Sequence, residues 1–220
     1  MKAVIFDMDG VLIDSQVLHN QAKQELLLRF GLSVPLEELK AFAGSSRAFF
    51  QATITRQYGV QWDWSEFYRA MDERVTELLE TVQPIPGAME TLDEIKHLGL
   101  KLGLATSSQK PILERVSARF QFDQRFDVIV CANDVENTKP DPEIFLLAAE
   151  RLRVLPAECA VVEDSLNGVR AAKAAGMYTV AITTTFPRYE LQIADRVIQS
   201  FDEIAGYYFL HVQLSDVESP

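Results

Sequence analysis

Acidic residues in this chain follow two short apolar runs at the point where each run stops. Asp7 comes directly after residues 3–6, and Asp164 lies just past residues 160–162. Short apolar runs that end at a glycine or at a helix-start signal are typical of fully buried strands in a parallel sheet. Because ligands of such sheets bind outside the carboxyl ends of the strands, these carboxylates are expected to meet at one edge of the fold.

Crowded carboxylates of this kind favour a bound cation. Asp9 and Glu163 lie beside Asp7 and Asp164 and bring the number of acidic side chains to four. Neighbouring carboxylates raise one another's pKa unless a cation lies among them. Hard oxygen ligands in small number suit Mg²⁺, which keeps several waters and accepts a phosphate oxygen as a further ligand. The sequence therefore predicts a magnesium-dependent phosphate site.

The segment Asp7-Met8-Asp9-Gly10 suggests a specific catalytic mechanism. A carboxylate at a strand end can attack a phosphorus atom and form a covalent intermediate. A second carboxylate two residues on, in a turn that Gly10 permits, can protonate the leaving oxygen and later deprotonate the attacking water. An Asp-x-Asp pair is also common in ordinary helix-capping turns, so this pattern depends on support from other sites.

Two further polar segments provide that support. Thr106-Ser107-Ser108 follows the apolar run 101–105, and its hydroxyls and backbone amides can hold phosphoryl oxygens, although such residues also form plain turns. Lys139 lies between a strand-like and a helix-like stretch, where flanking prolines can stiffen the segment and aim the ammonium at the carboxylates. A solvated surface lysine is the ordinary alternative. Each plain interpretation is reasonable singly, but their joint occurrence after predicted strands favours one phosphoryl-transfer site.

The charge balance limits the possible partners. The 220 residues include 21 Lys and Arg against 32 Asp and Glu, which gives a formal net charge of −11. Such a surface repels nucleic acid and anionic membranes, so neither is expected as a partner. It also repels a phosphorylated substrate. A phosphate site in this chain therefore needs local positive charge from a metal ion and a few basic residues.

Cysteine usage and hydropathy favour a cytoplasmic protein. Cys131 and Cys159 have neither metal-ligand nor redox spacing, and each lies in or beside an apolar run, so both are expected to pack in the core. No apolar run approaches transmembrane length. The first strand begins at Ala3, which leaves no room for a signal peptide before it.

Most of the chain alternates between helix and strand patterns. After Pro and Gly residues interrupt the pattern at 83–87, helices are predicted at 88–98, 111–120, 165–175 and from 142 onward, and strands at 101–105, 128–132, 160–162, 178–182 and 196–198. Alternation of this kind indicates right-handed crossovers and a parallel sheet with helices on both faces. We therefore predict an α/β fold with a doubly wound parallel sheet in three layers.

Residues 16–82 depart from this alternation. They are helical in pattern and contain no convincing strand, so we predict an α-helical cap domain at 16–82, inserted into a catalytic α/β domain formed by 1–15 and 83–220. The two joints of such an insert lie close together, which is a hinge geometry that allows a lid to close over the strand ends. Its aromatic residues are expected to pack between the cap helices, among them Trp62, Trp64, Phe67 and Tyr68.

The motifs together resemble the haloacid dehalogenase-like superfamily, in the subgroup that contains β-phosphoglucomutase and many small-molecule phosphatases. The resemblance extends over nearly the whole chain, including a helical cap after the first motif. The matching motifs are Asp7-Met8-Asp9-Gly10-Val11-Leu12, Thr106, Lys139-Pro140-Asp141-Pro142 and Glu163-Asp164-Ser165-x-x-Gly168.

The resemblance implies a role for each matching residue. Asp7 would be the nucleophile and a metal ligand, and Asp9 would be the general acid/base and bind the metal through its backbone carbonyl. Thr106 would bind the transferred phosphoryl group, and Lys139 would stabilise its charge. Asp164 would ligate Mg²⁺.

Other branches of the superfamily fit less well. The dehalogenase branch lacks the second aspartate, so Asp9 favours phosphate chemistry. The phosphonate-cleaving branch needs a cap lysine that forms a Schiff base, and Lys40 is the only lysine between Lys23 and Lys96, with no motif that aims it inward. The resemblance leaves open whether Glu163 is a further metal ligand or an acidic residue that contacts the ligands without binding the metal itself.

Residues of the insert bear on the choice between phosphatase and mutase. His19 and Gly44-Ser45-Ser46-Arg47 resemble the cap residues with which β-phosphoglucomutase senses closure and grips the distal phosphate of its substrate, a task that suits the planar guanidinium of Arg47. Related phosphatases carry similar residues, and a helix-face histidine and a solvated arginine are the ordinary alternatives. Ser107 is a further candidate for substrate binding. Residues 51–81 contain no lysine to bind the sugar, which favours hydrolysis.

We therefore predict a Mg²⁺-dependent phosphatase that acts on a small phosphorylated metabolite, such as a sugar phosphate, through an aspartyl-phosphate on Asp7. A phosphosugar mutase of the β-phosphoglucomutase type is the alternative. A phosphometabolite-binding module without catalysis is a weaker alternative, because no motif residue is lost. The protein is expected to be a monomer or a small homo-oligomer.

Overall fold

The computed structural model describes residues 1–40, 42 and 47–205. It divides into two compact units, one of Met1–Asp14 with Pro84–Pro220 and one of Ser15–Gln83. The roles predicted for these parts, a catalytic domain and a cap, stay predictions. The segment Gly44-Ser45-Ser46 lies outside the described residues. No helix in the described part of the chain is long and apolar enough to cross a membrane.

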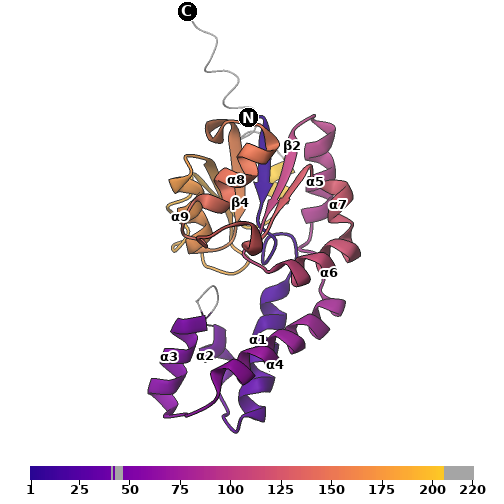
Figure 1. Ribbon diagram of the computed structural model, residues 1–220. Coiled ribbons are helices and arrows are strands. Elements are labelled where there is room, and N and C mark those ends of the chain that lie inside the picture. The colour runs from indigo at the N-terminus through magenta and orange to yellow at the C-terminus, as the bar shows by residue number, and fades with distance from the viewer. Residues whose placement is uncertain (41, 43–46, 206–220) are drawn as a thin grey trace, which may run out of the picture. The chain divides into compact units, whose positions relative to one another are not determined.

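The first unit is built on a six-stranded parallel sheet in the order β3-β2-β1-β4-β5-β6 (Figure 1). Its strands are β1 (Ala3–Phe6), β2 (Lys101–Ala105), β3 (Val128–Val130), β4 (Cys159–Glu163), β5 (Tyr178–Ile182) and β6 (Arg196–Ile198). From β1 the chain builds outward to β3 on one side and then from β4 to β6 on the other. The strand order therefore reverses between β1 and β4, and such a switch point is where ligands bind in open α/β sheets.

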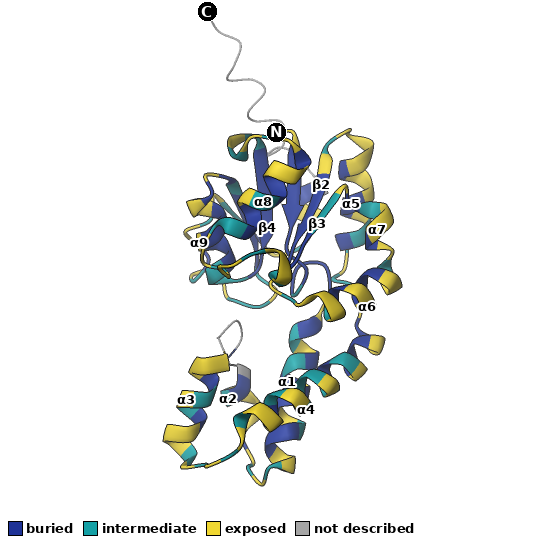
Figure 2. Cartoon of the chain, in the orientation of Figure 1, coloured by how far each residue is buried: buried dark blue, intermediate teal, exposed yellow. Residues whose placement is uncertain are grey.

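Helices follow the strands as the alternation predicts. The first unit contains the helices α5 (Ala88–His97), α6 (Lys110–Phe120), α7 (Phe122–Arg125), α8 (Glu143–Leu152), α9 (Leu166–Ala174) and α10 (Asp202–Ala205), with short 3₁₀ turns η2 (Ala132–Asp134) and η3 (Pro156–Glu158). Figure 2 shows the strands buried and the outer sides of these helices exposed. The predicted three-layer α/β fold is confirmed.

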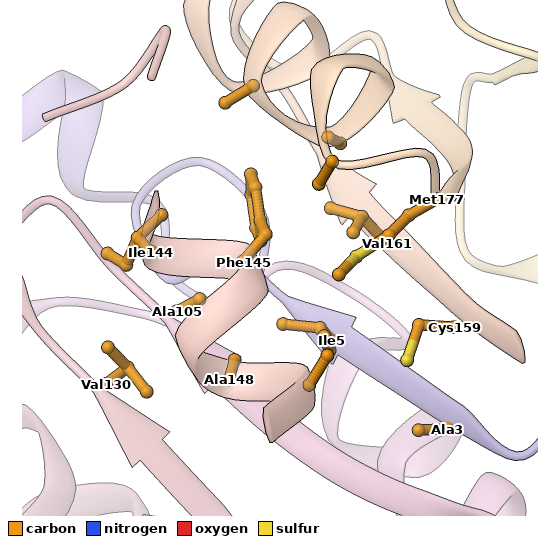
Figure 3. Packing of buried hydrophobic residues seen from close by; sticks show 14 of the residues in the cluster. Ala3, Ile5, Ala105, Val130, Ile144, Phe145, Ala148, Cys159, Val161 and Met177 are labelled. Carbon is orange, nitrogen blue, oxygen red and sulfur yellow. The ribbon is translucent and has the colours of Figure 1, made fainter. Parts of the chain in front are cut away.

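Side chains of β1 alternate between the two faces of the sheet and contribute to the core on both. Ala3 and Ile5 belong to one buried cluster with Phe145 of α8 and Val161 of β4 (Figure 3). Phe6 points to the opposite face, where its ring lies 6.4 Å from that of Phe126. Since both faces of the sheet are covered, the backbone of β1 is fully buried and only its end is left for a ligand.

Two predicted boundaries need correction. The third strand ends at Val130 instead of residue 132, because the Asp134 carboxylate accepts a hydrogen bond from the backbone N–H of Cys131 (2.9 Å) and starts the turn η2. The helix predicted from residue 142 begins at Glu143 with Pro142 at the N-cap. Both cysteines, Cys131 and Cys159, are free and buried, as the sequence predicts.

The second unit contains the helices α1 (Ser15–Arg29), α2 (Leu36–Lys40), α3 (Arg47–Tyr58) and α4 (Trp64–Leu78), then the turn η1 (Leu79–Thr81), and its described residues form no strand. Phe67 of α4 is fully buried, and its ring stacks against those of Trp62 (5.7 Å) and Phe50 (6.2 Å). Trp64 and Tyr68 pack against the same cluster. The prediction that these aromatic side chains pack between helices is confirmed.

Candidate active site

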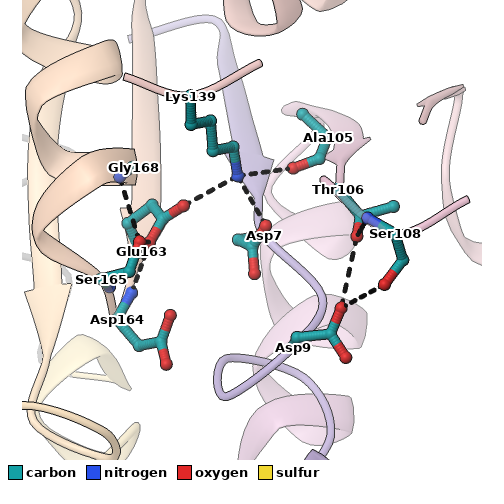
Figure 4. A network of polar contacts seen from close by, with 10 residues as sticks. All are labelled: Asp7, Asp9, Ala105, Thr106, Ser108, Lys139, Glu163, Asp164, Ser165 and Gly168. Carbon is teal, nitrogen blue, oxygen red and sulfur yellow. Dashed lines mark hydrogen bonds and ion pairs between the residues drawn. The ribbon is translucent and has the colours of Figure 1, made fainter. Parts of the chain in front are cut away.

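The carboxyl ends of β1, β2 and β4 bring the predicted catalytic and metal-binding residues together (Figure 4). Phe6 pairs with Leu104 of β2 and with Val162 of β4, so the residues after Phe6, Leu104 and Val162 lie in one row across the sheet. The backbone N–H of Asp7 continues the ladder by donating to the Val162 carbonyl at 3.0 Å. The strand register alone therefore places Asp7 between the end of β2 and Glu163, the last residue of β4.

Lys139 contacts all three of these strand ends. Its ammonium donates to Oδ1 of Asp7 (2.6 Å), to Oε1 of Glu163 (2.8 Å) and to the Ala105 carbonyl (3.1 Å), which uses all three of its protons. The side chain is only 6% exposed, and its ammonium lies 4.7 Å from the ring centroid of Phe145. Lys139 is therefore a buried counter-ion and not a solvated surface lysine.

A network of hydrogen bonds surrounds the carboxylate of Glu163. Oε2 of Glu163 accepts hydrogen bonds from the backbone N–H of Asp164 (2.9 Å) and from the N–H (2.8 Å) and hydroxyl (3.0 Å) of Ser165, while Oε1 faces Lys139. Gly168 makes room for this carboxylate, because a Cβ there would lie 1.7 Å from Oε1. Both oxygens of Glu163 are engaged in hydrogen bonds, and through them Glu163 holds Lys139 and the β4–α9 turn. A role of Glu163 as a further metal ligand stays a prediction.

Asp164 lies at the same edge and is closely packed by the turn after β1. It is 5% exposed, and one of its oxygens accepts a hydrogen bond from the Thr185 hydroxyl. Gly10 has φ +77°, and a Cβ at this position would lie 1.9 Å from Oδ2 of Asp164. Gly10 thus supplies both the positive φ and the close approach, and its carbonyl accepts from the Thr184 hydroxyl at 2.5 Å.

Thr184 and Thr185 are site residues that the sequence analysis missed. They belong to a run of three threonines directly after β5, the strand next to β4. A polar run after a strand is the signal that selected Thr106, so the same reasoning applied to residues 183–185 would have found them.

Asp9 is held by hydroxyl groups after β2. Ser108 Oγ donates to Oδ2 of Asp9 at 2.7 Å, and Thr106 Oγ1 lies 3.5 Å from the same oxygen. The backbone N–H of Ser108 donates to Thr106 Oγ1 at 2.9 Å, which fixes the turn. Ser107, the predicted substrate-binding serine, is exposed on this turn. The sequence does not single out Ser108, because the pattern of a turn does not reveal which serine points inward.

The buried part of the site carries an excess of negative charge. The carboxylates of Asp7, Glu163 and Asp164 stand against the single ammonium of Lys139, which leaves a net charge of −2 if all are ionised. Burial raises the pKa of Asp7 and Asp164 above the usual carboxyl range, and Glu163 adds to the rise. Burial alone would lower the pKa of Lys139, but the carboxylates of Asp7 and Glu163 reverse this and raise it. The ammonium is therefore charged and balances only one carboxylate.

The donor set and this charge fit a divalent cation. Among the residues that the structure describes, no three His, Cys, Asp or Glu side chains form a group that could hold a metal ion by themselves. The predicted set differs, since it uses two carboxylates, Asp7 and Asp164, with the backbone carbonyl of Asp9. Mg²⁺ is commonly bound by one or two carboxylates and completes its shell with waters and a substrate phosphate. A dication also cancels the excess charge of −2.

The two candidate residues of the second unit lie on separate helices. His19 is half-buried on α1. Arg47 begins α3, where its guanidinium forms an ion pair with Asp72 and lies 5.0 Å from the ring centroid of Tyr68. Arg47 is therefore tied to α4 and is not a freely solvated charge. Substrate binding by His19 and Arg47 stays a prediction.

Comparisons with known proteins agree with this fold. The family model for haloacid dehalogenase-like hydrolases matches residues 4–182. The phosphorylated carbohydrates phosphatase of Thermotoga maritima is 37% identical over 179 residues, which cover 80% of this chain and 82% of the relative. The fructose-1-phosphate phosphatase YqaB of Escherichia coli is 34% identical, with 81% and 95% covered. The crystal structure of β-phosphoglucomutase from Clostridium difficile superposes with a TM-score of 0.78 at 26% identity, covering 96% of this chain and 99% of that one.

Proposed function

The chain belongs to the haloacid dehalogenase-like hydrolase family, and on this premise we propose that it is a Mg²⁺-dependent phosphatase of a small phosphorylated metabolite, such as a sugar phosphate. The observation that carries the proposal is Asp7, held at the end of β1 by Lys139 in a buried cluster that carries an excess charge of −2 when all of its carboxylates are ionised. The two curated relatives described above are named as phosphatases, one of phosphorylated carbohydrates and one of fructose 1-phosphate, which supports hydrolysis over the mutase alternative.

The first half of the reaction transfers the phosphoryl group to the protein. Lys139 holds Oδ1 of Asp7, so we assign the attack on phosphorus to Oδ2. The new O–P bond forms while the bond to the alcohol oxygen breaks, and Asp9 donates its proton to that oxygen. Thr106 and the backbone amides of its turn bind the phosphoryl oxygens. A divalent ion held by Asp7, Asp164 and the Asp9 carbonyl would supply positive charge beside those oxygens.

The second half restores the protein. Asp9, now ionised, takes a proton from water, and the water oxygen attacks the phosphorus of the aspartyl-phosphate. The bond between phosphorus and the Asp7 oxygen breaks, which releases inorganic phosphate and returns the carboxylate. The hydrogen bonds from Ser108 and Thr106 keep Asp9 at the end of β2 through both halves.

Product analysis distinguishes the proposed phosphatase from the two alternatives. The protein is expected to release phosphate from p-nitrophenyl phosphate and from phosphorylated sugars when Mg²⁺ is present. With β-glucose 1-phosphate and a bisphosphate primer, free phosphate is the expected product. Formation of glucose 6-phosphate would identify a mutase, and lack of turnover with every substrate would favour a binding module.

Magnesium is expected to stabilise the protein, and more so at high pH. The folded-state pKa of Asp7 and Asp164 lies above the unfolded-state value, so the metal-free protein loses stability as pH rises through the ordinary carboxyl range and beyond. Protons and Mg²⁺ compete for these oxygens. The Mg²⁺-induced rise in melting temperature should therefore be larger at about pH 8 than at about pH 5.5. Thermal melts in EDTA and in Mg²⁺, with NaCl matched for ionic strength, measure it; equal rises at both values would contradict the assignment.

Ser108→Ala is expected to slow hydrolysis by a factor that depends on the leaving group of the substrate. An alkyl alcohol leaves only when it is protonated, whereas p-nitrophenolate leaves without help, and Ser108 holds the proposed acid Asp9 at 2.7 Å. Its kcat should fall on the order of 10-fold with a sugar phosphate and little with p-nitrophenyl phosphate. Ser65→Ala removes a similar hydroxyl–carboxylate bond, to Asp63 at 2.6 Å, and should change neither rate. Equal losses with both substrates would indicate a merely structural serine.

A further inference from the structure

Thr185 connects the loop after β5 to Asp164, one of the two carboxylates that are predicted to bind the metal. Its hydroxyl donates a hydrogen bond to Oδ2 of Asp164. Glu163, the last residue of β4, pairs with Ala181 of β5, so Asp164 lies beside the end of β5 and the threonines that follow it. The register of two neighbouring strands therefore brings this hydroxyl to one particular oxygen of a predicted metal ligand.

The turn after β1 packs against this hydrogen bond. A Cβ at Gly10 would lie 1.9 Å from Oδ2 of Asp164 and 2.8 Å from Oγ1 of Thr185, so the Gly10 backbone lies against both partners. The hydroxyl of the neighbouring Thr184 donates to the Gly10 carbonyl at 2.5 Å and holds the turn in place. Oδ2 of Asp164 thus has a hydrogen-bond donor and a close backbone neighbour, both supplied by the α/β unit.

The other oxygen of Asp164 is left for a ligand. Only 5% of Asp164 is exposed, yet Oδ1 has no hydrogen-bond partner among the residues that the structure describes. Within the same residues, Ser117 Oγ is the one side-chain polar atom that is both inaccessible and unpartnered, so Oδ1 of Asp164 keeps some accessible surface. A buried carboxylate that is held through one oxygen and open at the other can offer a metal ion one oxygen only.

The other predicted ligands are limited in a similar way. Lys139 donates to Oδ1 of Asp7 at 2.6 Å, so Asp7 cannot give both oxygens to a metal without losing this ion pair. The backbone of Asp9 has one carbonyl oxygen to offer. Mg²⁺ requires near-ideal octahedral geometry and keeps several waters, so single oxygens from a few groups suit it. Ca²⁺ takes about 6–8 oxygens and can bind both oxygens of a carboxylate, which this arrangement does not offer.

We propose that Thr185 is a positioning residue that sets the metal preference of the site. By holding Oδ2 of Asp164, it limits this carboxylate to one metal-binding oxygen and shifts the preference toward Mg²⁺ and away from the larger Ca²⁺. The inference rests on the metal site of the proposed phosphatase, and it adds which ion the site selects and which side chain makes the selection. Hydrogen bonds to metal ligands commonly change metal affinity by about 10- to 100-fold.

Thr185→Val tests the inference through metal binding and needs no turnover. Valine keeps the shape of threonine but cannot donate a hydrogen bond, so Oδ2 of Asp164 becomes free to bind a metal together with Oδ1. Calorimetric titration of the metal-free, full-length protein with MgCl₂ and with CaCl₂ gives both dissociation constants. The Kd for Ca²⁺ divided by the Kd for Mg²⁺ should fall by about 10-fold or more in Thr185→Val. An unchanged ratio would overturn the inference, even if both affinities fall.

Further variants separate this role from ordinary packing. Thr185→Ala also removes the donor and should lower the ratio likewise, whereas Thr185→Ser keeps a hydroxyl and should stay within about 2-fold of the wild type. Thr179→Val is the matched control, because Thr179 is a fully buried threonine of β5 whose hydroxyl donates to the Met177 carbonyl at 3.2 Å. It should leave the ratio unchanged. A shift in Thr179→Val as large as that in Thr185→Val would show a general effect of β5 and overturn the inference.

The same titrations distinguish a failure of this inference from a failure of the proposed function. If the wild-type protein binds neither ion, the metal site itself is wrong, and the metal dependence of the proposed phosphatase is refuted together with the role of Thr185. If the wild-type protein binds Mg²⁺ and the ratio is the same in Thr185→Val and Thr185→Ala, only the role of Thr185 is refuted and the proposed function stands.

Discussion

Asp7→Asn is expected to abolish phosphatase turnover, with kcat reduced on the order of 10⁴-fold or more. A carboxamide oxygen is a poor nucleophile and cannot form the acyl phosphate. The change is otherwise mild, since the amide oxygen can still accept the hydrogen bond that Lys139 donates at 2.6 Å. Steady-state hydrolysis of p-nitrophenyl phosphate measures the loss, and acid-quenched mass spectrometry of the protein during turnover detects the phosphorylated intermediate in the wild type alone.

The same variant should fold at least as well as the wild type when metal is absent. Burial raises the pKa of Asp7, so its ionised form is unfavourable in the metal-free cluster, and removing that charge relieves repulsion with Glu163. Asp195→Asn is the matched control, because Asp195 also accepts from a lysine, Lys173 at 2.5 Å, but lies away from the site. It should keep its activity. Activity near the wild-type level in Asp7→Asn would refute the nucleophile assignment.

The fold and the convergence of the acidic residues could be predicted from the sequence because buried strands appear in it as short apolar runs. The runs at 3–6 and 178–182 are apolar since a central parallel strand is covered on both faces, and the observed strands have the same bounds. Once the strands are parallel, residues that follow them must meet at one edge. That argument needs only the order of elements, so it placed Asp7 and Asp164 at one edge of the sheet although 157 positions separate them.

Side-chain directions in turns could not be predicted in the same way. Thr106, Ser107 and Ser108 are chemically alike, and only the backbone path after β2 decides that Ser108 contacts Asp9 while Ser107 is exposed. The role of Glu163 likewise depends on donors from its own turn, which a linear pattern does not reveal.

The second unit shows a related limit. A helical spacing indicated that the aromatic residues pack together, but it gives no sign of the pairing between Arg47 and Asp72, which lie 25 residues apart. Lys23 is one polar residue among several on α1 in the sequence, and only its burial in the structure sets it apart. Tertiary contacts between helices determine both features.

Lys139→Met is expected to cost both stability and activity. Without the ammonium, the buried carboxylates of Asp7 and Glu163 face each other unpaired, and the charge of the ionised cluster changes from −2 to −3. Removing one partner of a buried ion pair costs about 3–5 kcal/mol of unfolding free energy. Loss of the charge beside the transferred phosphoryl group should also reduce kcat by about 10²- to 10³-fold. Urea unfolding and steady-state kinetics measure the two effects.

The pH dependence of the stability loss distinguishes a counter-ion from a packing residue. Lys139 lowers the pKa of Asp7, so in Lys139→Met this pKa rises further above its unfolded value. A carboxyl whose folded pKa is raised destabilises the protein above its unfolded pKa and ceases to do so as falling pH protonates it in both states. Because the pKa of Asp7 in the wild type is already about 8, the part of the deficit of metal-free Lys139→Met that comes from Asp7 should be small below neutral pH and grow as pH rises through about 8. Lys173→Met removes a partly exposed pair with Asp195 and should cost at most about 1 kcal/mol. A deficit in Lys139→Met that is no larger than this, or that stays constant with pH, would contradict the role of Lys139 as the buried counter-ion of Asp7.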